Sequence, residues 1–121
     1  MSWTDWTAAT GDGLDNFEYL IYEKKHHQKL KGGVARVSLN RAEKMNALNT
    51  DVIQEMFRAF YDASHDTSIG VIVLAAQGKH FGAGGDVEWE RWGLREVFYN
   101  RYPHNRLMRI SRKPIIAQVQ G

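Results

Sequence analysis

The feature that most constrains the fold is an unbroken apolar run from Val71 to Ala76, which follows Gly70. Both alternating faces of this run are apolar, and that pattern predicts a strand buried between two layers. The run is far shorter than the roughly 20 apolar residues that a membrane-spanning helix needs. We therefore expect a layered domain with no membrane segment.

The segments before this strand predict a hairpin. Residues 17–23 are rich in aromatic and β-branched side chains, and residues 34–39 alternate apolar with polar positions, so both are expected to be strands. The basic stretch 24–33 between them ends in a glycine pair, which is a turn signal. Residues 1–16 are polar and show no periodicity, so we expect a loose arm followed by one domain over residues 17–121.

The remaining segments alternate helix and strand patterns. Apolar residues recur at helical spacing up to Ala63 after Thr50, the expected N-cap. Residues 94–110 predict a second helix with a break at Pro103, and residues 114–119 predict another short buried strand. The order is strand, strand, helix, strand, helix, strand. This order predicts an α/β fold with parallel pairing after the opening hairpin.

Composition and charge exclude several classes of protein. The chain has 121 residues, which suits one domain, and no cysteine, which excludes disulfides and thiolate metal ligands. Its five histidines show no metal-like spacing with carboxylates, so we expect no metal site. The net charge of +2 is too small to indicate nucleic-acid binding. The first 16 residues carry no Lys or Arg, so no targeting signal is recognised and the expected location is cytoplasmic.

A glycine-rich segment, His80 to Asp86, directly follows the apolar strand and its loop. Glycines around one alanine let the backbone turn sharply, and consecutive amides in such a turn can bind a phosphate or a developing oxyanion. A tight loop without a ligand is the alternative. The spacing fits neither the dinucleotide fingerprint nor the phosphate-binding loop of nucleotide hydrolases. Nucleotide-dependent phosphoryl or hydride transfer is therefore disfavoured.

Four sequence blocks, in this order and spacing, resemble the crotonase (enoyl-CoA hydratase/isomerase) superfamily. The blocks are residues 34–41 (VARVSLNR), 43–48 (EKMNAL), 70–87 with its glycine-rich segment, and 113–121 (KPIIAQVQG). The resemblance covers residues 17–121 and departs from the family at Ala42, where proline is usual, and in the longer loop 24–33. It implies a crotonase-like spiral of ββα units, incomplete in this chain, and an acyl-CoA substrate.

The resemblance also implies roles for individual residues. The backbone N–H of Ala83 aligns with the first of two oxyanion donors, which stabilise negative charge on the thioester oxygen. The positions that match the coenzyme A-binding segments are Lys44, Met45, Ala47, Leu48, Gly84, Gly85, Asp86 and Val87. The second donor and the catalytic carboxylates of the family correspond to positions beyond Gly121. We therefore expect a truncated chain that is inactive alone, with coenzyme A as part of the substrate and no separate cofactor.

Several functions remain open at this point. The first is a crotonase-class hydratase, isomerase, hydrolase or synthase, with a slight preference for cyclic or aromatic acyl groups, in a homo-oligomer such as a trimer or dimer of trimers. The second is a non-catalytic acyl-CoA-binding or assembly half-domain. The third is a single-strand nucleic-acid binder that uses the basic and aromatic residues 92–113. Competition by coenzyme A would favour the first two, and only turnover separates them.

Overall fold

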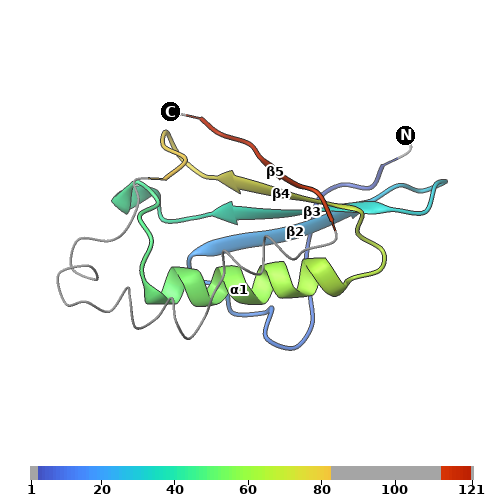
Figure 1. The fold of residues 1–121 in the computed structure, drawn as a ribbon, viewed down its shortest axis with the longest axis horizontal. Helices are drawn as coiled ribbons and strands as arrows, with labels where there is room; N and C mark the ends of the chain where they lie inside the picture. The colour runs from blue at the N-terminus through green and yellow to red at the C-terminus, as the bar shows by residue number, and fades with distance from the viewer. Residues whose placement is uncertain (1–2, 83–112, 121) are drawn as a thin grey trace.

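The computed structural model describes residues 3–82 and 113–120 of the chain. In these residues, helix α1 lies across one face of a mixed β-sheet (Figure 1). The sheet contains, in spatial order, β1 (Thr7–Ala8), β2 (Leu20–His26), β3 (Gly33–Leu39), β4 (Val71–Ala76) and β5 (Ile115–Ala117). A short 3₁₀ helix, η1 (Ala42–Lys44), and helix α1 (Thr50–His65) connect β3 to β4.

The strand pairing confirms the predicted α/β architecture. Strands β2 and β3 are antiparallel, with Leu20 opposite Leu39 and His26 opposite Gly33, as expected for a hairpin. Strand β4 is parallel to β3, and β5 is parallel to β4. Because β3 and β4 are parallel, the chain must cross back over the sheet between them, and α1 makes this crossing. The helix predicted over residues 94–110 lies outside the described residues.

The core lies between α1 and the sheet face that it covers. From β3, Ala35, Val37 and Leu39 point toward the helix and are buried, as the alternation in the sequence requires. From α1, an apolar stripe that includes Met56 and Phe60 packs against them. Removing one large apolar side chain such as Phe60 from water contributes about 1.5–3 kcal/mol to stability.

Several local predictions differ from the structure. Strand β2, expected over residues 17–23, spans Leu20–His26. The N-cap of α1 is Asn49, whose side-chain Oδ1 accepts a hydrogen bond from Val52 N, while Thr50 is already the first helical residue. Strand β4 was expected to be buried on both faces, but only Ile72 is fully buried, since α1 covers one face. Strand β5 was also expected to be buried, yet the Ile116 side chain is 55% exposed. Among the described residues β5 pairs with β4 alone, so it forms an edge of the sheet.

The N-terminal arm contacts the sheet. Thr7 and Ala8 pair antiparallel with Lys24 and Glu23, and the Trp6 ring lies against two cations of the sheet, Lys25 of β2 and Arg36 of β3. The arm that was expected to be loose is therefore attached to the sheet at these residues. The boundary between arm and domain at residue 17 stays a prediction.

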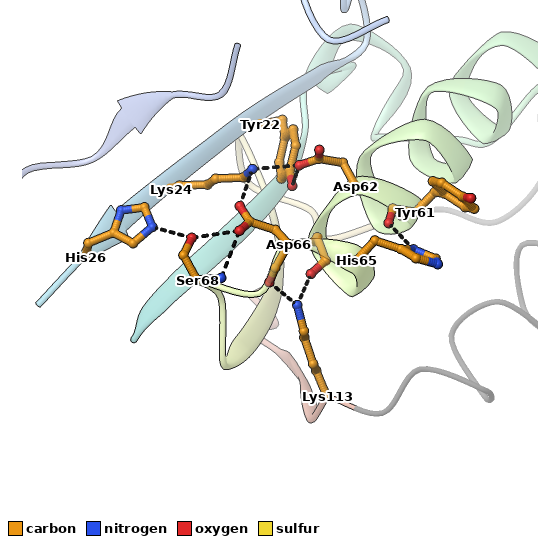
Figure 2. A network of polar contacts seen from close by, with 10 residues as sticks. Tyr22, Lys24, His26, Tyr61, Asp62, His65, Asp66, Ser68 and Lys113 are labelled. Carbon is orange, nitrogen blue, oxygen red and sulfur yellow. Dashed lines mark hydrogen bonds and ion pairs between the residues drawn. The ribbon is translucent and has the colours of Figure 1, made fainter. Parts of the chain in front are cut away.

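An ion-pair network connects the C-terminal end of α1 to the hairpin (Figure 2). The Lys24 ammonium group lies 2.6 Å from Asp62 Oδ2 and 2.7 Å from Asp66 Oδ2. The Tyr22 hydroxyl donates to the same Asp62 oxygen at 2.6 Å. On the other side of Asp66, Oδ1 accepts from both the backbone N–H and the hydroxyl of Ser68. One lysine of β2 thus bridges two carboxylates at the end of the helix.

The same network reaches the start of β5. The Lys113 ammonium group donates to the carbonyl oxygens of Ala63 and Asp66, at the end of α1. Ala63 lies in the last turn of the helix and Asp66 is its C-cap residue, and a cation at this end suits the helix dipole. One side chain therefore fixes β5 to the helix from a position just outside the strand.

Hydrogen bonds and charges in this network shift the pKa values of Asp66 and Lys24. Partial burial alone raises the pKa of the Asp66 carboxyl, but hydrogen bonds from Lys24 and Ser68 outweigh burial and lower the pKa to about 2. Burial alone also lowers the pKa of Lys24, and the bonds to Asp62 and Asp66 reverse that and raise it. Both shifts favour the charged pair, so the pair contributes to stability while both groups are ionised.

We predict that the Asp66→Asn variant loses about 2 kcal/mol of stability at pH 7. The folded pKa of about 2 lies below the ordinary value of 3.8. The contribution is therefore present above pH ~4 and disappears as the pH falls toward 2. Urea denaturation between pH 7 and pH 3 measures it. Asp15→Asn, at an exposed position, is the control and should change stability by less than about 0.5 kcal/mol. Identical pH curves for the two variants would contradict the prediction.

Candidate functional site

Three loops follow the parallel strands at the same edge of the sheet. Residues 40–49 follow β3, residues 77–82 follow β4, and residues 118–120 follow β5. Figure 1 shows η1, the loop after β4 and the C-terminus at this shared edge. In open α/β sheets, ligands bind at the carboxyl ends of the strands. The sequence blocks that carry the resemblance therefore meet where a ligand site is expected.

The first loop turns through two residues in the left-handed region. Met45 has φ 50° and Asn46 has φ 56°, a conformation that is uncommon outside glycine and in which Asn is enriched. The turn is closed by Arg41, whose carbonyl accepts from Asn46 N at 2.8 Å and whose N–H donates to Asn46 Oδ1 at 2.8 Å. The Arg41 guanidinium also donates to the carbonyl of Ala47 at 3.0 Å. This loop is therefore held by its own polar groups.

The side chain of Asn46 connects the first loop to the second. Its Nδ2 donates to the carbonyl of Gln77 at 2.9 Å and to the carbonyl of His80 at 2.7 Å. The residue is only 1% exposed, and both donors and the acceptor of its side-chain amide are used. A buried amide left without these partners would cost about 1–3 kcal/mol per unpaired group. Asn46 thus fixes the position of residues 77–82.

The third loop holds the other side of the same segment. Gln120 Nε2 donates to the carbonyls of Ala76 at 2.7 Å and Gly78 at 3.1 Å. The backbone carbonyl of Gln120 accepts a hydrogen bond from Phe81 N at 3.1 Å. Gly78 has φ +83°, and a Cβ atom there would lie 2.9 Å from the Cβ of Ala42, so this close approach needs glycine. The loop of residues 77–82 is therefore held between Asn46 and Gln120 by bonds that extend to Phe81.

The predicted binding residues divide into three groups. Lys44 and Met45 are exposed at the edge of the site, and the Met45 side chain is 51% exposed. Ala47 is buried and Leu48 packs against the core, so they support the loop from inside. The predicted oxyanion donor and the rest of the glycine-rich segment lie outside the described residues, namely Ala83, Gly84, Gly85, Asp86 and Val87.

Two residues with central positions at this edge were not predicted from the sequence. Asn46 lies between residues that the resemblance did assign, and its signal is that Asn is favoured where φ is positive. Gln120 gives no such signal, because its partners, the carbonyls of Ala76 and Gly78, are far away in the sequence.

The same residues lack two other features that would indicate a function. Within residues 3–82 and 113–120, no His, Asp and Glu side chains gather in a group able to hold a metal ion. In those ranges there is also no helix with both the length and the apolar character required to cross a bilayer.

Comparisons with known proteins agree with this geometry. The chain is 32% identical over 108 residues to the mitochondrial enoyl-CoA hydratase of Pongo abelii, covering 88% of this chain and 36% of that protein. The crystal structure of an enoyl-CoA hydratase from Shewanella pealeana superposes with a TM-score of 0.66 at 32% identity, over 86% of this chain and 40% of that one. An enoyl-CoA hydratase/isomerase from Xanthobacter autotrophicus Py2 gives a TM-score of 0.72 at 26% identity, over 88% and 40%. The chain thus spans less than half the length of these relatives.

We predict that Asn46→Asp destabilises the protein by about 2–4 kcal/mol and loosens residues 77–82. The variant keeps the size of the side chain but loses both donors and places a carboxyl group against the carbonyls of Gln77 and His80. Urea denaturation measures the loss, and amide hydrogen exchange at Phe81 reports the loop. The control is Met45→Asp, which places a carboxyl group at the neighbouring residue. Met45 is exposed and also has a positive φ, so this variant should change the stability little. Equal losses in both variants would contradict the assigned role of Asn46.

The match to a family model covers the elements that build this edge. The model of the enoyl-CoA hydratase/isomerase family matches residues 29–121. This range contains β3, α1, β4, β5 and the loops that Asn46 and Gln120 hold together. The structural neighbours share the same mixed sheet with its covering helix. The chain therefore belongs to the enoyl-CoA hydratase/isomerase (crotonase) family.

Proposed function

We propose that this chain supplies the coenzyme A-binding part, and the first oxyanion donor, of a crotonase-class acyl-CoA enzyme. The observation that carries the proposal is the support of residues 77–82 by Asn46 and Gln120, at the carboxyl edge of the sheet. This support reaches Phe81, in the glycine-rich segment and two residues before Ala83. The backbone N–H proposed as the donor, that of Ala83, thus follows a loop that hydrogen bonds already hold in position.

The chemistry proposed for Ala83 uses its backbone. In an acyl-CoA reaction that forms an enolate, negative charge develops on the thioester oxygen, and an N–H that is already in place stabilises it without reorganisation. The side chain at this position takes no part, so a small residue suffices. Loss of one such donor lowers the rate of an enzyme by about 10²–10³-fold.

The charges at this edge suit the phosphates of coenzyme A. Lys44 on the first loop and Lys79 on the second are both exposed, so both ammonium groups are available to an anionic ligand. The exposed Met45 side chain lies next to Lys44 and offers an apolar contact to a nucleobase. We propose that these loops bind the nucleotide part of coenzyme A, with Gly84 to Val87 along the pantetheine arm.

The remaining parts of the reaction are proposed by resemblance alone. The second oxyanion donor and the acid–base carboxylates correspond to positions after Gly121, so turnover requires residues that this sequence does not contain. A homo-oligomer is proposed on the same basis.

In a protein continued to the length of its relatives, we predict that Ala83→Pro lowers turnover of a short enoyl-CoA at least about 10²-fold. Proline has no N–H, so the donor is lost, while affinity for coenzyme A should change less. Ala83→Ser keeps the N–H and should keep most activity. Circular dichroism must show that both variants fold. A folded proline variant with unchanged turnover would defeat the assignment.

The 121-residue chain itself provides the second test of the proposal. We predict that coenzyme A shifts its thermal unfolding, because the proposed binding loops are present. On a panel of enoyl-, ketoacyl- and cyclic acyl-CoAs we predict no turnover, because one donor without a placed carboxylate cannot complete the reaction. Sedimentation of the same samples shows whether any observed turnover comes from a monomer or from an oligomer. Multiple turnover by a monomer would contradict the proposal that the acid–base carboxylates correspond to positions after Gly121. No response to coenzyme A would contradict the binding role proposed for the loops.

A further inference from the structure

The tip of the β2–β3 hairpin is not used by the proposed function. The tip consists of residues 27–32, between His26 at the end of β2 and Gly33 at the start of β3. The loops of the candidate site follow the other end of β3. The length of β3 separates the tip from that edge by about 20 Å, at ~3.3 Å per residue. Figure 1 shows the two at opposite ends of the sheet, so the tip can contact a partner while the candidate site stays open.

Hydrogen bonds hold the tip in one shape. The backbone N–H of His27 donates to the carbonyl of Gly32 at 3.0 Å. The Nδ1 atom of the His27 ring accepts from the backbone N–H groups of Lys29 at 3.1 Å and Leu30 at 2.8 Å. The same ring packs edge-on against the Trp3 ring, with the two centroids 5.1 Å apart. The tip is therefore preorganised, and little conformational freedom is lost when it docks on a partner.

The tip presents apolar side chains between cations. Lys29 and Lys31 are both exposed. Leu30, which lies between them in the sequence, is 69% exposed, and Trp3 beside the tip is 44% exposed. Apolar side chains on a rigid loop gain free energy when a partner removes them from water. Tryptophan next to lysines with long apolar stems is typical of protein surfaces in the lipid headgroup region.

The charge of this surface is positive. Residues 24–33 contain four lysines and no acid. Lys24 is paired with acids of α1, but among the described residues no carboxylate pairs with Lys25, Lys29 or Lys31. Asp5 on the N-terminal arm is an exposed acid close to these lysines in the sheet. The cations outnumber it, so charge complementarity favours an anionic partner.

We propose that the hairpin tip docks on a membrane surface that contains anionic lipids. Lys29 and Lys31 contact the headgroups, while Leu30 enters the boundary between headgroups and acyl chains. The contact is peripheral and needs no segment that spans the bilayer. A nucleic acid is disfavoured, because an aliphatic side chain offers no stacking surface to a base. In addition, Lys25 Nζ already lies over the Trp3 ring, 5.4 Å from its centre.

Co-sedimentation of the 121-residue chain with lipid vesicles tests the proposal. The chain should bind vesicles made of equal parts phosphatidylcholine and phosphatidylserine, and should bind phosphatidylcholine vesicles far more weakly. Each lysine at an anionic surface contributes a factor of about five. The double variant Lys29→Gln/Lys31→Gln should therefore bind the mixed vesicles about 20-fold more weakly. Leu30→Ser should bind about fivefold more weakly, because it removes apolar area without a change in charge.

The double variant Lys44→Gln/Lys79→Gln is the matched control. It removes the same amount of charge from exposed positions at the opposite edge of the sheet, and it should keep its binding to the mixed vesicles. Equal losses in the control and in the tip variant would overturn the inference, because net charge alone would then explain the binding. The three substituted tip residues are exposed, so the variants should fold, and circular dichroism checks this.

The remaining outcomes are equally decisive. No binding to the mixed vesicles, or equal binding to both kinds of vesicle, would overturn the inference. Unchanged binding of Leu30→Ser would also overturn it, because no apolar contact would then be made. Tight binding of a labelled single-stranded oligonucleotide that requires the two tip lysines but not Leu30 would assign the surface to nucleic acid instead. The response of thermal unfolding to coenzyme A should persist in the tip variant, and its absence from the unaltered chain would overturn only the proposed function.

Discussion

Loops that follow parallel strands meet at one edge of a sheet, but their relative position is fixed only when a bond connects them. In this chain the connection is the buried side-chain amide of Asn46, which donates to Gln77 and His80 and accepts from Arg41. Without it, the two loops would share an edge but no defined geometry. The segment before the glycine-rich sequence owes its placement to this amide and, on its other side, to Gln120.

The two edges of the sheet have different roles. At the edge where β4 and β5 begin, charged groups are paired with one another, with Lys24 between Asp62 and Asp66. At the carboxyl edge, backbone carbonyls are bound by amides, and the exposed cations Lys44 and Lys79 remain at the surface. Charged groups around Lys24 are therefore paired with one another, and the charges proposed to bind coenzyme A lie at the other edge.

Much of this arrangement follows from the sequence, because strand period and apolar runs act locally. The bounds of β4 and the existence of the β2–β3 hairpin were predicted for that reason, although β2 lies three residues later than expected. The N-cap was placed one residue late, since Asn49 and Thr50 are both good caps and the sequence does not show which one is extended. The exposure of β5 depends on its neighbours and has no local signal. The oxyanion assignment of Ala83 came from family resemblance, and the described residues do not include it.

The use of every polar group around Asn46 also affects the chemical ageing of the protein. Asparagine is among the thermolabile residues, and it deamidates when the nitrogen of the next residue attacks the side-chain carbonyl carbon. Here the nitrogen of Ala47 is bonded to the carbonyl of Lys44, and Asn46 Oδ1 is bonded to Arg41. The attacking atom and the carbonyl are both held away from the reactive arrangement. The amide on which the candidate site depends is therefore protected, by its own hydrogen bonds, from slow conversion to a carboxylate.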